Sequence, residues 1–375
     1  MRVPFNRSDP MGRELEYMQE ALAHGQISGG QIFTRRCEHL LQEITGVPRA
    51  ILTTSCTHAL EMAAILLNIT TGDEVIVPSF AFVSTINAFV LRGATPVFVD
   101  IREDTLNLDE SLLDSAITSR TRAVVPVHYA GVACEMNSIM AVAVRRGVAV
   151  VEDNAHGLMG SYQGRKLGTF GCLATQSFHE TKNFTCGEGG ALMINASEYT
   201  ERAEIIRDKG TNRSRFIRGQ VDKYTWIDLG SSYVPSDMLA AFLLAQLEQR
   251  HMIQSRREKL WTRYQESLAS WARSQAVRLP VVPAGCDSAY HLYHLVLPSP
   301  ERRDALMDHL AARGILSVFH YLPLHQSPMA RAMGAGSARC PVAESIAGRL
   351  LRLPLYNSMG PQDQDMVIAA ILDFQ

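Results

Sequence analysis

The fold is decided by residues 123–153, AVVPVHYAGVACEMNSIMAVAVRRGVAVVED. Two β-branched runs, 123–127 and 148–151, flank a segment over 136–146 whose apolar residues recur at helical spacing. Gly147 follows that segment, and glycine is the residue that helix ends favour. A strand, a helix and a second strand in this order predict two parallel strands of one sheet, because a parallel connection needs a crossover of helical length.

The same alternation continues on both sides of this unit. Further β-branched runs lie at 51–54, 75–77 and 96–99, with helical segments between several of them, and another strand is expected around 174–178. Repeated strand–helix–strand units are typical of a sheet whose two faces are both covered by helices. The sequence therefore predicts an α/β protein with a mostly parallel sheet.

The alternation stops after Val234-Pro235-Ser236-Asp237, where a long helical stretch runs as far as Lys259. We place a boundary near residue 250. The large α/β domain then covers residues 1–250, and a smaller α+β domain covers residues 251–375. The strands of the smaller domain are predicted at 290–297 and 316–321.

Composition narrows the classes of function. The 375 residues are 46% hydrophobic and 20% charged, as in ordinary folded proteins with a large core. The net charge of −2 is too balanced for a protein whose main partner is nucleic acid. No apolar run approaches the ~20 residues of a membrane span, and the opening MRVPFNRSDP has no apolar signal core. We expect a cytoplasmic protein with no nucleic-acid or membrane partner.

Polar side chains gather where three predicted strands end. Glu152-Asp153 end one strand, a second leads from Ser177 to Lys182, and Ser55-Cys56-Thr57 open a helix after the first. Ligands of doubly wound sheets bind at this edge. An acid, a lysine and a hydroxyl-rich helix start fit pyridoxal phosphate, which needs a Schiff-base amine, a carboxylate at the ring nitrogen and phosphate donors.

Other ligand classes fit less well. No GxGxxG dinucleotide motif follows the first strand, and the glycines of GEGG (187–190) suit the start of a strand that passes close to other backbone. His291 and His294 point to opposite faces of a strand, and His320 with His325 lacks a third ligand. No metal site is predicted.

Several stretches are specific enough to carry a family resemblance: PSFAFVST (78–85), PVH (126–128), VED (151–153), SFHETK (177–182) and HYLPLH (320–325). With them, nearly the whole chain resembles the DegT/DnrJ/EryC1/StrS family of sugar-nucleotide aminotransferases. The resemblance implies the aspartate aminotransferase-like fold, fold type I of the pyridoxal-phosphate enzymes. GTNRS (210–214), RGQVDKYTW (218–226) and SCT (55–57) are similar to the branch that aminates dTDP-4-keto-6-deoxy-D-glucose at C4, of the enterobacterial common antigen type.

The resemblance implies a role for each residue that surrounds the cofactor ring. Lys182 is the Schiff-base lysine and proton shuttle, and Asp153 lies on the pyridinium nitrogen. His156 packs on the ring, where many members have Gln. Phe82 stacks on the other face.

Phosphate ligands are implied in the same way. They are Thr57, the His58 backbone and Ser177, and Cys56 replaces the glycine of the usual Gly-Thr pair. Many members read Gly-Tyr-Asn-Tyr-Arg where this chain reads GSSYV (230–234), and their Asn reaches the phosphate of the neighbouring subunit. Ser232 takes that position with a shorter side chain. A homodimer with shared active sites is therefore expected.

The substrates implied are a dTDP-sugar and L-glutamate. Arg213 and Lys223 are candidates for the substrate pyrophosphate or are solvated charges, and His320 and Tyr321 are candidates for the wall of the substrate pocket. The expected product is a dTDP-4-amino-4,6-dideoxyhexose, with galacto and gluco both open, for an antibiotic sugar or a surface polysaccharide.

Three alternatives remain. A 3-keto sugar nucleotide could be the acceptor instead. A sugar dehydratase of the same family would carry His at the position of Lys182, which disfavours that reading. A non-catalytic cofactor-binding regulator would carry a DNA-binding module or an extra domain, and the chain shows neither.

Overall fold

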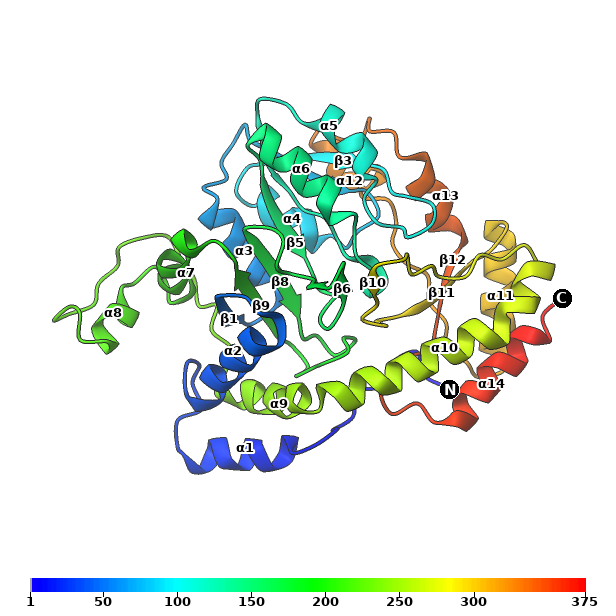
Figure 1. Ribbon diagram of the computed structural model, residues 1–375, viewed down its shortest axis with the longest axis horizontal. Helices are drawn as coiled ribbons and strands as arrows, with labels where there is room; N and C mark the ends of the chain where they lie inside the picture. Colours follow the sequence, from blue (N-terminus) through cyan, green and yellow to red (C-terminus); the bar gives the residue numbers. More distant parts are fainter. Residues whose placement is uncertain (1) are drawn as a thin grey trace.

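The β-branched runs, the strand expected around 174–178 and the strand that the GEGG run starts form a seven-stranded sheet in the computed structural model, which describes residues 2–375 (Figure 1). In spatial order the strands are β1 (Arg49–Thr53), β9 (Gly190–Ile194), β8 (Leu173–Ser177), β5 (Ala149–Asp153), β4 (Thr121–Val124), β2 (Glu74–Pro78) and β3 (Thr95–Val99). β9 pairs antiparallel with both of its neighbours, and every other pair is parallel. The prediction of an α/β protein with a mostly parallel sheet is confirmed.

Helices cover both faces of this sheet because successive side chains of a strand point to opposite sides. On β1, Ile51 packs with the helices of one face, whereas Ala50 and Leu52 pack with those of the other. The first face is covered by α3 (Cys56–Leu66), α4 (Ser84–Val90) and α7 (Thr200–Arg207). The second is covered by α2 (Ile32–Thr45), α6 (Met136–Arg146) and α9 (Asp237–Glu248).

A second core lies between the C-terminal elements, along the long helix α10 (Arg250–Ser274). Its strands β11 (Tyr293–Val296) and β12 (Leu350–Leu353) pair antiparallel. Its other helices are α11 (Pro300–Ala312) and α14 (Pro361–Leu372), whereas α13 (Pro341–Arg349) packs in a separate cluster that includes Phe80 and Tyr129. Val3 is also buried in the second core and pairs with Ile315. The division near residue 250 stays a prediction.

The remaining elements are short, apart from one helix at the start of the chain. They are α1 (Glu14–Ala23), α5 (Leu113–Ala116), α8 (Arg213–Ile217), α12 (Pro328–Ala332) and the strands β6 (Ser161–Tyr162), β7 (Arg165–Lys166) and β10 (Cys286–Asp287). No helix in residues 2–375 combines the length and apolar character needed to cross a membrane.

Two strand predictions were wrong in extent. The segment 316–321 forms no strand. The amide of Leu316 donates to the carbonyl of Val3 at 3.0 Å and Val318 pairs with Arg352, but the next carbonyl, that of Phe319, accepts from the Arg352 side chain instead of from a neighbouring strand. The strand predicted at 290–297 is shortened to β11. The guanidinium of the buried Arg257 binds the carbonyl of Tyr290, 2.9 Å away, and that of His291, which removes both from strand pairing.

Gly190 starts β9 beside the loop that precedes α3. A Cβ atom at this position would lie 2.3 Å from the carbonyl carbon of Ser55 and 2.4 Å from the amide nitrogen of Cys56. Both are backbone atoms, so they cannot move aside as a flexible side chain would. The GEGG run therefore does start a strand that passes close to other backbone.

We expect G190A to destabilise the protein by about 2 kcal/mol, as overpacking of tight sites does. The substitution should also weaken cofactor binding, because it displaces the start of α3. Denaturant unfolding and cofactor titration measure the two effects. Gly360, with no atom within 4 Å of its Cβ position and no positive φ, supplies the control G360A. Equal stability of the two variants would contradict the prediction.

Candidate active site

A cavity of about 1140 Å³ lies at the carboxyl ends of β5 and β8. The first turns of α3 and α4 border it on the sheet side, and the segment 318–328 and β12 border it on the C-terminal side. Eight residues of the predicted site line it: Thr57, Phe82, Asp153, His156, Ser177, Lys182, His320 and Tyr321. The strand-end pattern thus located the cavity.

Lys182 follows β8 in a turn in which its amide donates to the carbonyl of His179 at 2.9 Å. The ammonium group makes no ion pair within residues 2–375, so no carboxylate there compensates for the water that the group loses on burial. Burial lowers the pKa of Lys182 from 10.5 to about 8, against the opposing charges of Cys56 and Asp153. About a tenth of this amine is therefore neutral at pH 7, far more than in an ordinary lysine, and the neutral form is the one that a nucleophile and proton acceptor requires.

We expect Lys182 of the cofactor-free protein to react with an acylating reagent with a midpoint near pH 8, because only the neutral amine reacts. An ordinary lysine titrates at about pH 10.4. Below pH 8 the folded protein protonates the amine and labelling falls. Peptide mass mapping across pH 6–11 compares Lys182 with the exposed Lys259 in one sample. Identical profiles for the two lysines would contradict the prediction.

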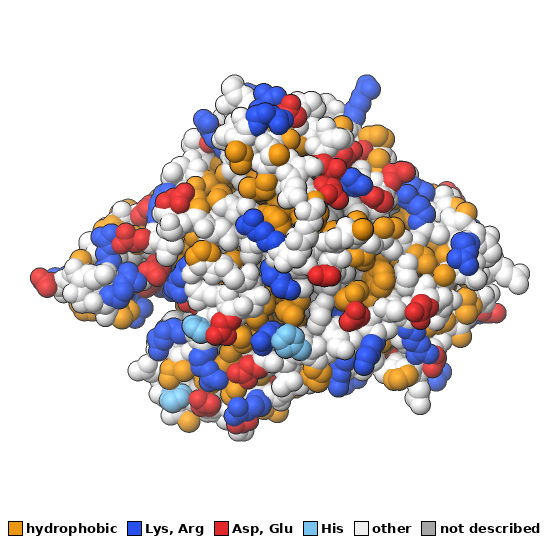
Figure 2. Space-filling model, viewed as in Figure 1, with side chains coloured by type: hydrophobic (Ala, Val, Ile, Leu, Met, Phe, Trp, Pro, Cys, Tyr) orange, Lys and Arg blue, Asp and Glu red, His pale blue; other side chains and the backbone are white. Residues whose placement is uncertain are grey.

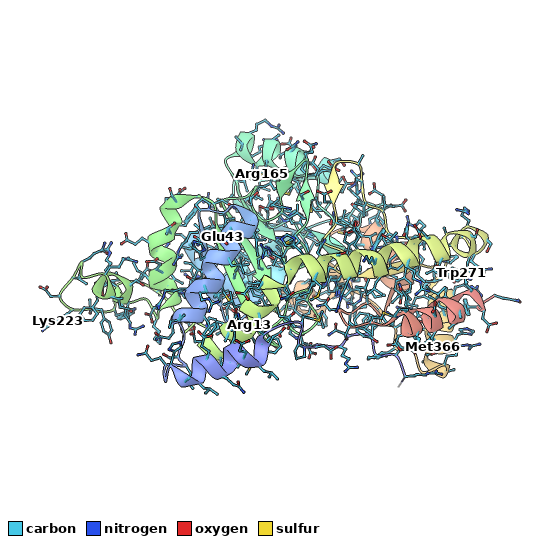
Figure 3. All side chains as sticks on the ribbon, turned by 60° about the horizontal axis from the view of Figure 1, so that its bottom comes forward. Arg13, Glu43, Arg165, Lys223, Trp271 and Met366 are labelled. Atoms are coloured by element: carbon cyan, nitrogen blue, oxygen red, sulfur yellow. The ribbon has the colours of Figure 1, made fainter. Side chains whose placement is uncertain are left out.

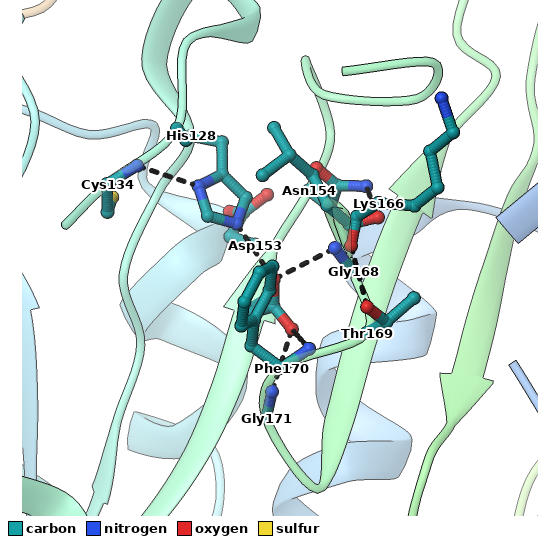
Figure 4. Close-up of polar contacts among 12 residues, drawn as sticks. His128, Cys134, Asp153, Asn154, Lys166, Gly168, Thr169, Phe170 and Gly171 are labelled. Atoms are coloured by element: carbon teal, nitrogen blue, oxygen red, sulfur yellow. Dashed lines mark hydrogen bonds and ion pairs between the residues drawn. The ribbon is translucent and has the colours of Figure 1, made fainter. Parts of the chain in front are cut away.

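Glu152 and Asp153 are consecutive in β5, so their side chains point to opposite faces of the sheet. The buried Glu152 accepts from His128 Nε2 at 2.9 Å and from three backbone amides of the 168–171 loop (Figure 4). All of its acceptor capacity is used in anchoring this loop. Glu152 is therefore structural, and Asp153 is left as the acid that faces the cavity.

Asp153 is held in place by two donors. Thr85 Oγ1 donates to its Oδ2 at 2.7 Å, and the amide of Ala155 donates to its Oδ1 at 3.2 Å. Its exposed fraction is only 5%, and no Arg or Lys lies within ion-pair distance in residues 2–375. A buried carboxylate without a cation suits a cationic ligand, such as a protonated pyridine ring.

Aromatic rings also line the cavity, His156, His291 and Phe82 among them. His156 is buried with an unpartnered Nδ1 and stacks on His291, with ring centroids 4.1 Å apart. Burial lowers the pKa of His156 well below its usual range, so the ring is neutral and can pack on another ring. Phe82 is 55% exposed although apolar, which excludes the alternative that it is an ordinary core residue. Both side chains are available to contact a planar cofactor.

Hydroxyl groups border the phosphate end of the predicted site. Thr57 Oγ1 donates to Ser84 Oγ at 2.8 Å, and Ser177 and Ser55 also line the cavity. The amide of His58, expected to bind phosphate, instead donates to Ser55 Oγ at 3.1 Å as the cap of α3, and His58 does not line the cavity. The helix start still offers hydroxyl donors and the positive end of its dipole.

Arg213, Lys223 and Ser232 lie outside this cavity. They belong to an arm over 208–232 that projects from the body, with Lys223 at its tip (Figure 3). All three are exposed. The arm also exposes Ile217 by 67% and Trp226 by 75%, and apolar side chains lie among its charged ones (Figure 2). Within a single copy of the chain, none of these three residues lines the cavity.

Sequence reasoning missed four side chains near the site. Thr85 holds Asp153, His291 stacks on His156, Tyr129 Oη bonds His320 Nδ1 at 3.0 Å, and Arg352 lines the cavity. Only Thr85 carried a usable signal, because it stands in the PSFAFVST stretch. No group of three or more His, Cys, Asp or Glu in residues 2–375 is arranged to hold a metal.

These residues fit pyridoxal phosphate. The cavity holds the unpaired amine of Lys182, the buried carboxylate of Asp153 without a cation and the unpartnered ring nitrogen of His156. It also borders the start of α3, which the backbone at Gly190 approaches closely. Each feature meets a need of that cofactor.

Comparisons with known proteins agree with this fit. The model of the DegT/DnrJ/EryC1/StrS aminotransferase family matches residues 10–372. The solved structure of the aminotransferase TlmJ from Streptoalloteichus hindustanus is 30% identical, covers 98% of this chain and 96% of its own, and has a TM-score of 0.89. The structure of DesV from S. venezuelae, solved with a ketimine intermediate, is 33% identical to this chain and has a TM-score of 0.88. The match covers 99% of this chain and 98% of DesV.

A further neighbour was solved in forms that differ in the cofactor. The apo form of the putative sugar aminotransferase Spr1654 from Streptococcus pneumoniae is 27% identical to this chain and has a TM-score of 0.91. The match covers 99% of this chain and 97% of Spr1654. It is also known in PLP and PMP forms. The chain belongs to the DegT/DnrJ/EryC1/StrS aminotransferase family and is a pyridoxal-phosphate-dependent aminotransferase.

Proposed function

We propose that this aminotransferase transfers the amino group of L-glutamate to C4 of dTDP-4-keto-6-deoxy-D-glucose. The product is a dTDP-4-amino-4,6-dideoxyhexose. The observation that carries the proposal is the meeting of Lys182 and Asp153 in one cavity of about 1140 Å³. Its volume exceeds the roughly 300–1,000 Å³ of usual ligand pockets, so a cofactor and a sugar nucleotide both have room.

When bound, pyridoxal phosphate supplies an aldehyde that reacts with amines and a ring that accepts the electron pair left on carbon when a proton departs. Lys182 Nζ would take the proton from the α-carbon of the donor in the first half-reaction and would give a proton to C4 of the acceptor in the second, roles that its lowered pKa supports. Asp153 holds the proton of the ring nitrogen. His156 and Phe82 orient the ring, and the hydroxyls of Thr57 and Ser177 bind the phosphate.

The choice of acceptor rests on the stretches 210–214 and 218–226, which are similar to the C4-aminating branch. The neighbour Spr1654 is described as a sugar aminotransferase, which supports a sugar acceptor. His320 and Tyr321 line the cavity from the segment opposite Lys182 and form its substrate wall.

The experiment is product analysis after incubation with L-glutamate and one of two acceptors, dTDP-4-keto-6-deoxy-D-glucose or its 3-keto isomer. Amination of the 4-keto compound supports the proposal, and the NMR couplings at C4 distinguish a galacto from a gluco product. If only the 3-keto compound reacts, the regiochemistry is wrong. If glutamate does not change the absorbance of the cofactor, the donor is wrong.

We further propose a cytoplasmic homodimer in which the arm reaches the site of the second copy. The exposed apolar side chains of the arm, Ile217 and Trp226 among them, supply a surface to bury. In the dimer, Arg213 and Lys223 bind the diphosphate of the substrate, and Ser232 contacts the cofactor phosphate.

Mixed dimers test the shared site. A chain carrying K182A and a chain carrying R213A and K223A are each expected to be inactive alone. When the two are mixed, half of the sites in a mixed dimer combine an intact lysine with an intact arm, and activity returns. Sedimentation equilibrium gives the oligomeric state. A monomer, or a mixture that stays inactive, contradicts the proposal.

A further inference from the structure

The buried Arg257 of α10 has no part in the chemistry proposed above, although it is among the largest fully buried side chains of residues 2–375. Only 2% of it is exposed, and no carboxylate in that range forms an ion pair with it. Burial lowers the pKa of Arg257 to about 9, so the guanidinium stays charged at neutral pH. A buried charge without a counter-ion is costly unless hydrogen bonds satisfy it. The partners of its donors therefore indicate its role.

Four hydrogen bonds join the guanidinium to two segments of the chain. Nε donates to the carbonyl of Tyr290 at 2.9 Å, and Nη2 donates to that of His291. Nη1 donates to Asn357 Oδ1 at 2.9 Å, and Nη2 also reaches the carbonyl of Leu355 at 3.5 Å. Tyr290 has a φ of 49°, a left-handed conformation that is unfavourable for a bulky residue and needs such a restraint. Arg257 therefore fixes the segment before β11 and the segment after β12 against α10.

Asn357 continues from the arginine to the turn that carries Lys182. Its Nδ2 donates to the carbonyl of Asn183 at 2.9 Å, and Asn183 directly follows Lys182. The side chain of Asn183 is held in turn: Nδ2 donates to the carbonyl of Ala289 at 2.7 Å, which leaves Oδ1 to accept from His291 Nδ1 at 2.9 Å. The lysine turn and the His291 ring thus belong to one hydrogen-bonded unit that ends at the guanidinium.

The ring of His291 extends this unit into the cavity. It stacks on His156 with ring centroids 4.1 Å apart, and both rings line the cavity. Because Nδ1 donates to Asn183, this nitrogen carries the proton of the neutral ring. Burial, followed by the charges of His156, Lys182 and Arg257, holds the pKa of this ring well below its usual range, so the ring stays neutral.

We propose that Arg257 is a positioning residue of the active site. Through Asn357 it fixes the turn of Lys182, and through the carbonyl of His291 it fixes the ring that packs against His156. It acts through these neighbours and does not itself line the cavity. This inference rests on the proposed role of Lys182 and is independent of the choice of acceptor.

The variant N357D tests the link without removing the arginine. An aspartate keeps the shape of the side chain and can still accept from Arg257, but it cannot donate to the carbonyl of Asn183. We expect kcat to fall about tenfold, because small misplacements of reacting groups are costly in rate, while the KM for L-glutamate changes less than about threefold. N357A loses both bonds and should lose at least as much kcat. R257K, whose single ammonium group cannot hold two segments at once, should behave like N357A.

A measurement on the cofactor-free protein needs no turnover. In wild type, the acylation of Lys182 has its expected midpoint near pH 8. When the turn is released, water reaches the ammonium group and relieves its desolvation, so the midpoint in N357D should rise by about one pH unit, towards that of an ordinary lysine.

The matched control is Y264F. Tyr264 also lies on α10, is buried and donates to the carbonyl of Pro354 at 3.0 Å, in the same segment that follows β12, but it has no bond to Asn183. Y264F should lower the stability measured by denaturant unfolding and leave kcat and the midpoint of Lys182 unchanged.

The outcomes are distinct. Wild-type kcat and midpoint in N357D, or equal losses in N357D and Y264F, would overturn the assignment of Arg257 and leave the proposed function intact. A midpoint that rises in N357D without a loss of kcat would also overturn it, because the reaction would then not need the turn to be held. A wild-type holoenzyme that does not respond to L-glutamate would instead contradict the proposed function.

Discussion

Replacement of Lys182 by alanine is expected to reduce turnover by about a thousandfold or more, while the protein still folds and binds its cofactor. The loss removes both the amine that bonds the cofactor and the group that moves the proton, and general acid–base catalysis alone contributes about 10²–10⁴. Steady-state kinetics with L-glutamate measures the loss. The other cofactor contacts, Asp153 and the hydroxyls at the start of α3, remain in K182A.

The matched control is K259A, because Lys259 is exposed on α10 and does not line the cavity. Sodium borohydride reduction of the wild-type holoenzyme, followed by peptide mass mapping, should place the cofactor on the peptide that contains Lys182. A label on any other lysine, or full activity of K182A, would overturn the assignment.

The substitution D153N is expected to lower kcat by about 10²–10³, because removal of one partner of a buried ion pair costs about 3–5 kcal/mol. The amide keeps the shape of the carboxylate and can still accept from Thr85, so the fold is retained. It cannot balance the positive charge of a protonated ring nitrogen. The cofactor should bind more weakly, which absorbance titration measures independently of activity.

Asp308 supplies the control for this variant, since it is exposed on α11 and outside the cavity. D308N should keep wild-type kcat and cofactor affinity. If D153N behaves like D308N, the acid at position 153 does not hold the ring proton. Glu152 does not offer a second candidate, because its carboxylate is already bound by His128 and three amides.

The local sequence pattern predicted the strands of residues 1–250 better than those of residues 251–375. The strands β2 and β5 are buried on both faces, so each appears as a continuous apolar, largely β-branched run that the sequence alone identifies. The segment 316–321 contains the same kinds of residue, yet its backbone is used by the side chain of Arg352 and forms no strand. The helical stretch after Asp237 is interrupted at Gln249, between α9 and α10.

Some residues of the candidate site could likewise be predicted from the sequence, and others could not. Lys182 and Asp153 could be predicted because the ends of parallel strands meet at one edge whatever the details of packing. Arg352 could not, because one arginine among the leucines of β12 looks like the solvated side of an ordinary strand. His291 was read as part of a strand and not as the ring that stacks on His156.

The sequence by itself determined the order of strands and helices, the edge of the sheet where the cavity lies and the lysine and acid that line it, because local patterns identify the parallel strands and the ends of such strands meet at one edge. Only the tertiary structure decided which rings stack beside that edge and which cation is left without a counter-charge. These depend on segments more than a hundred residues apart, and their approach is set by the packing of two cores and is written in no local pattern.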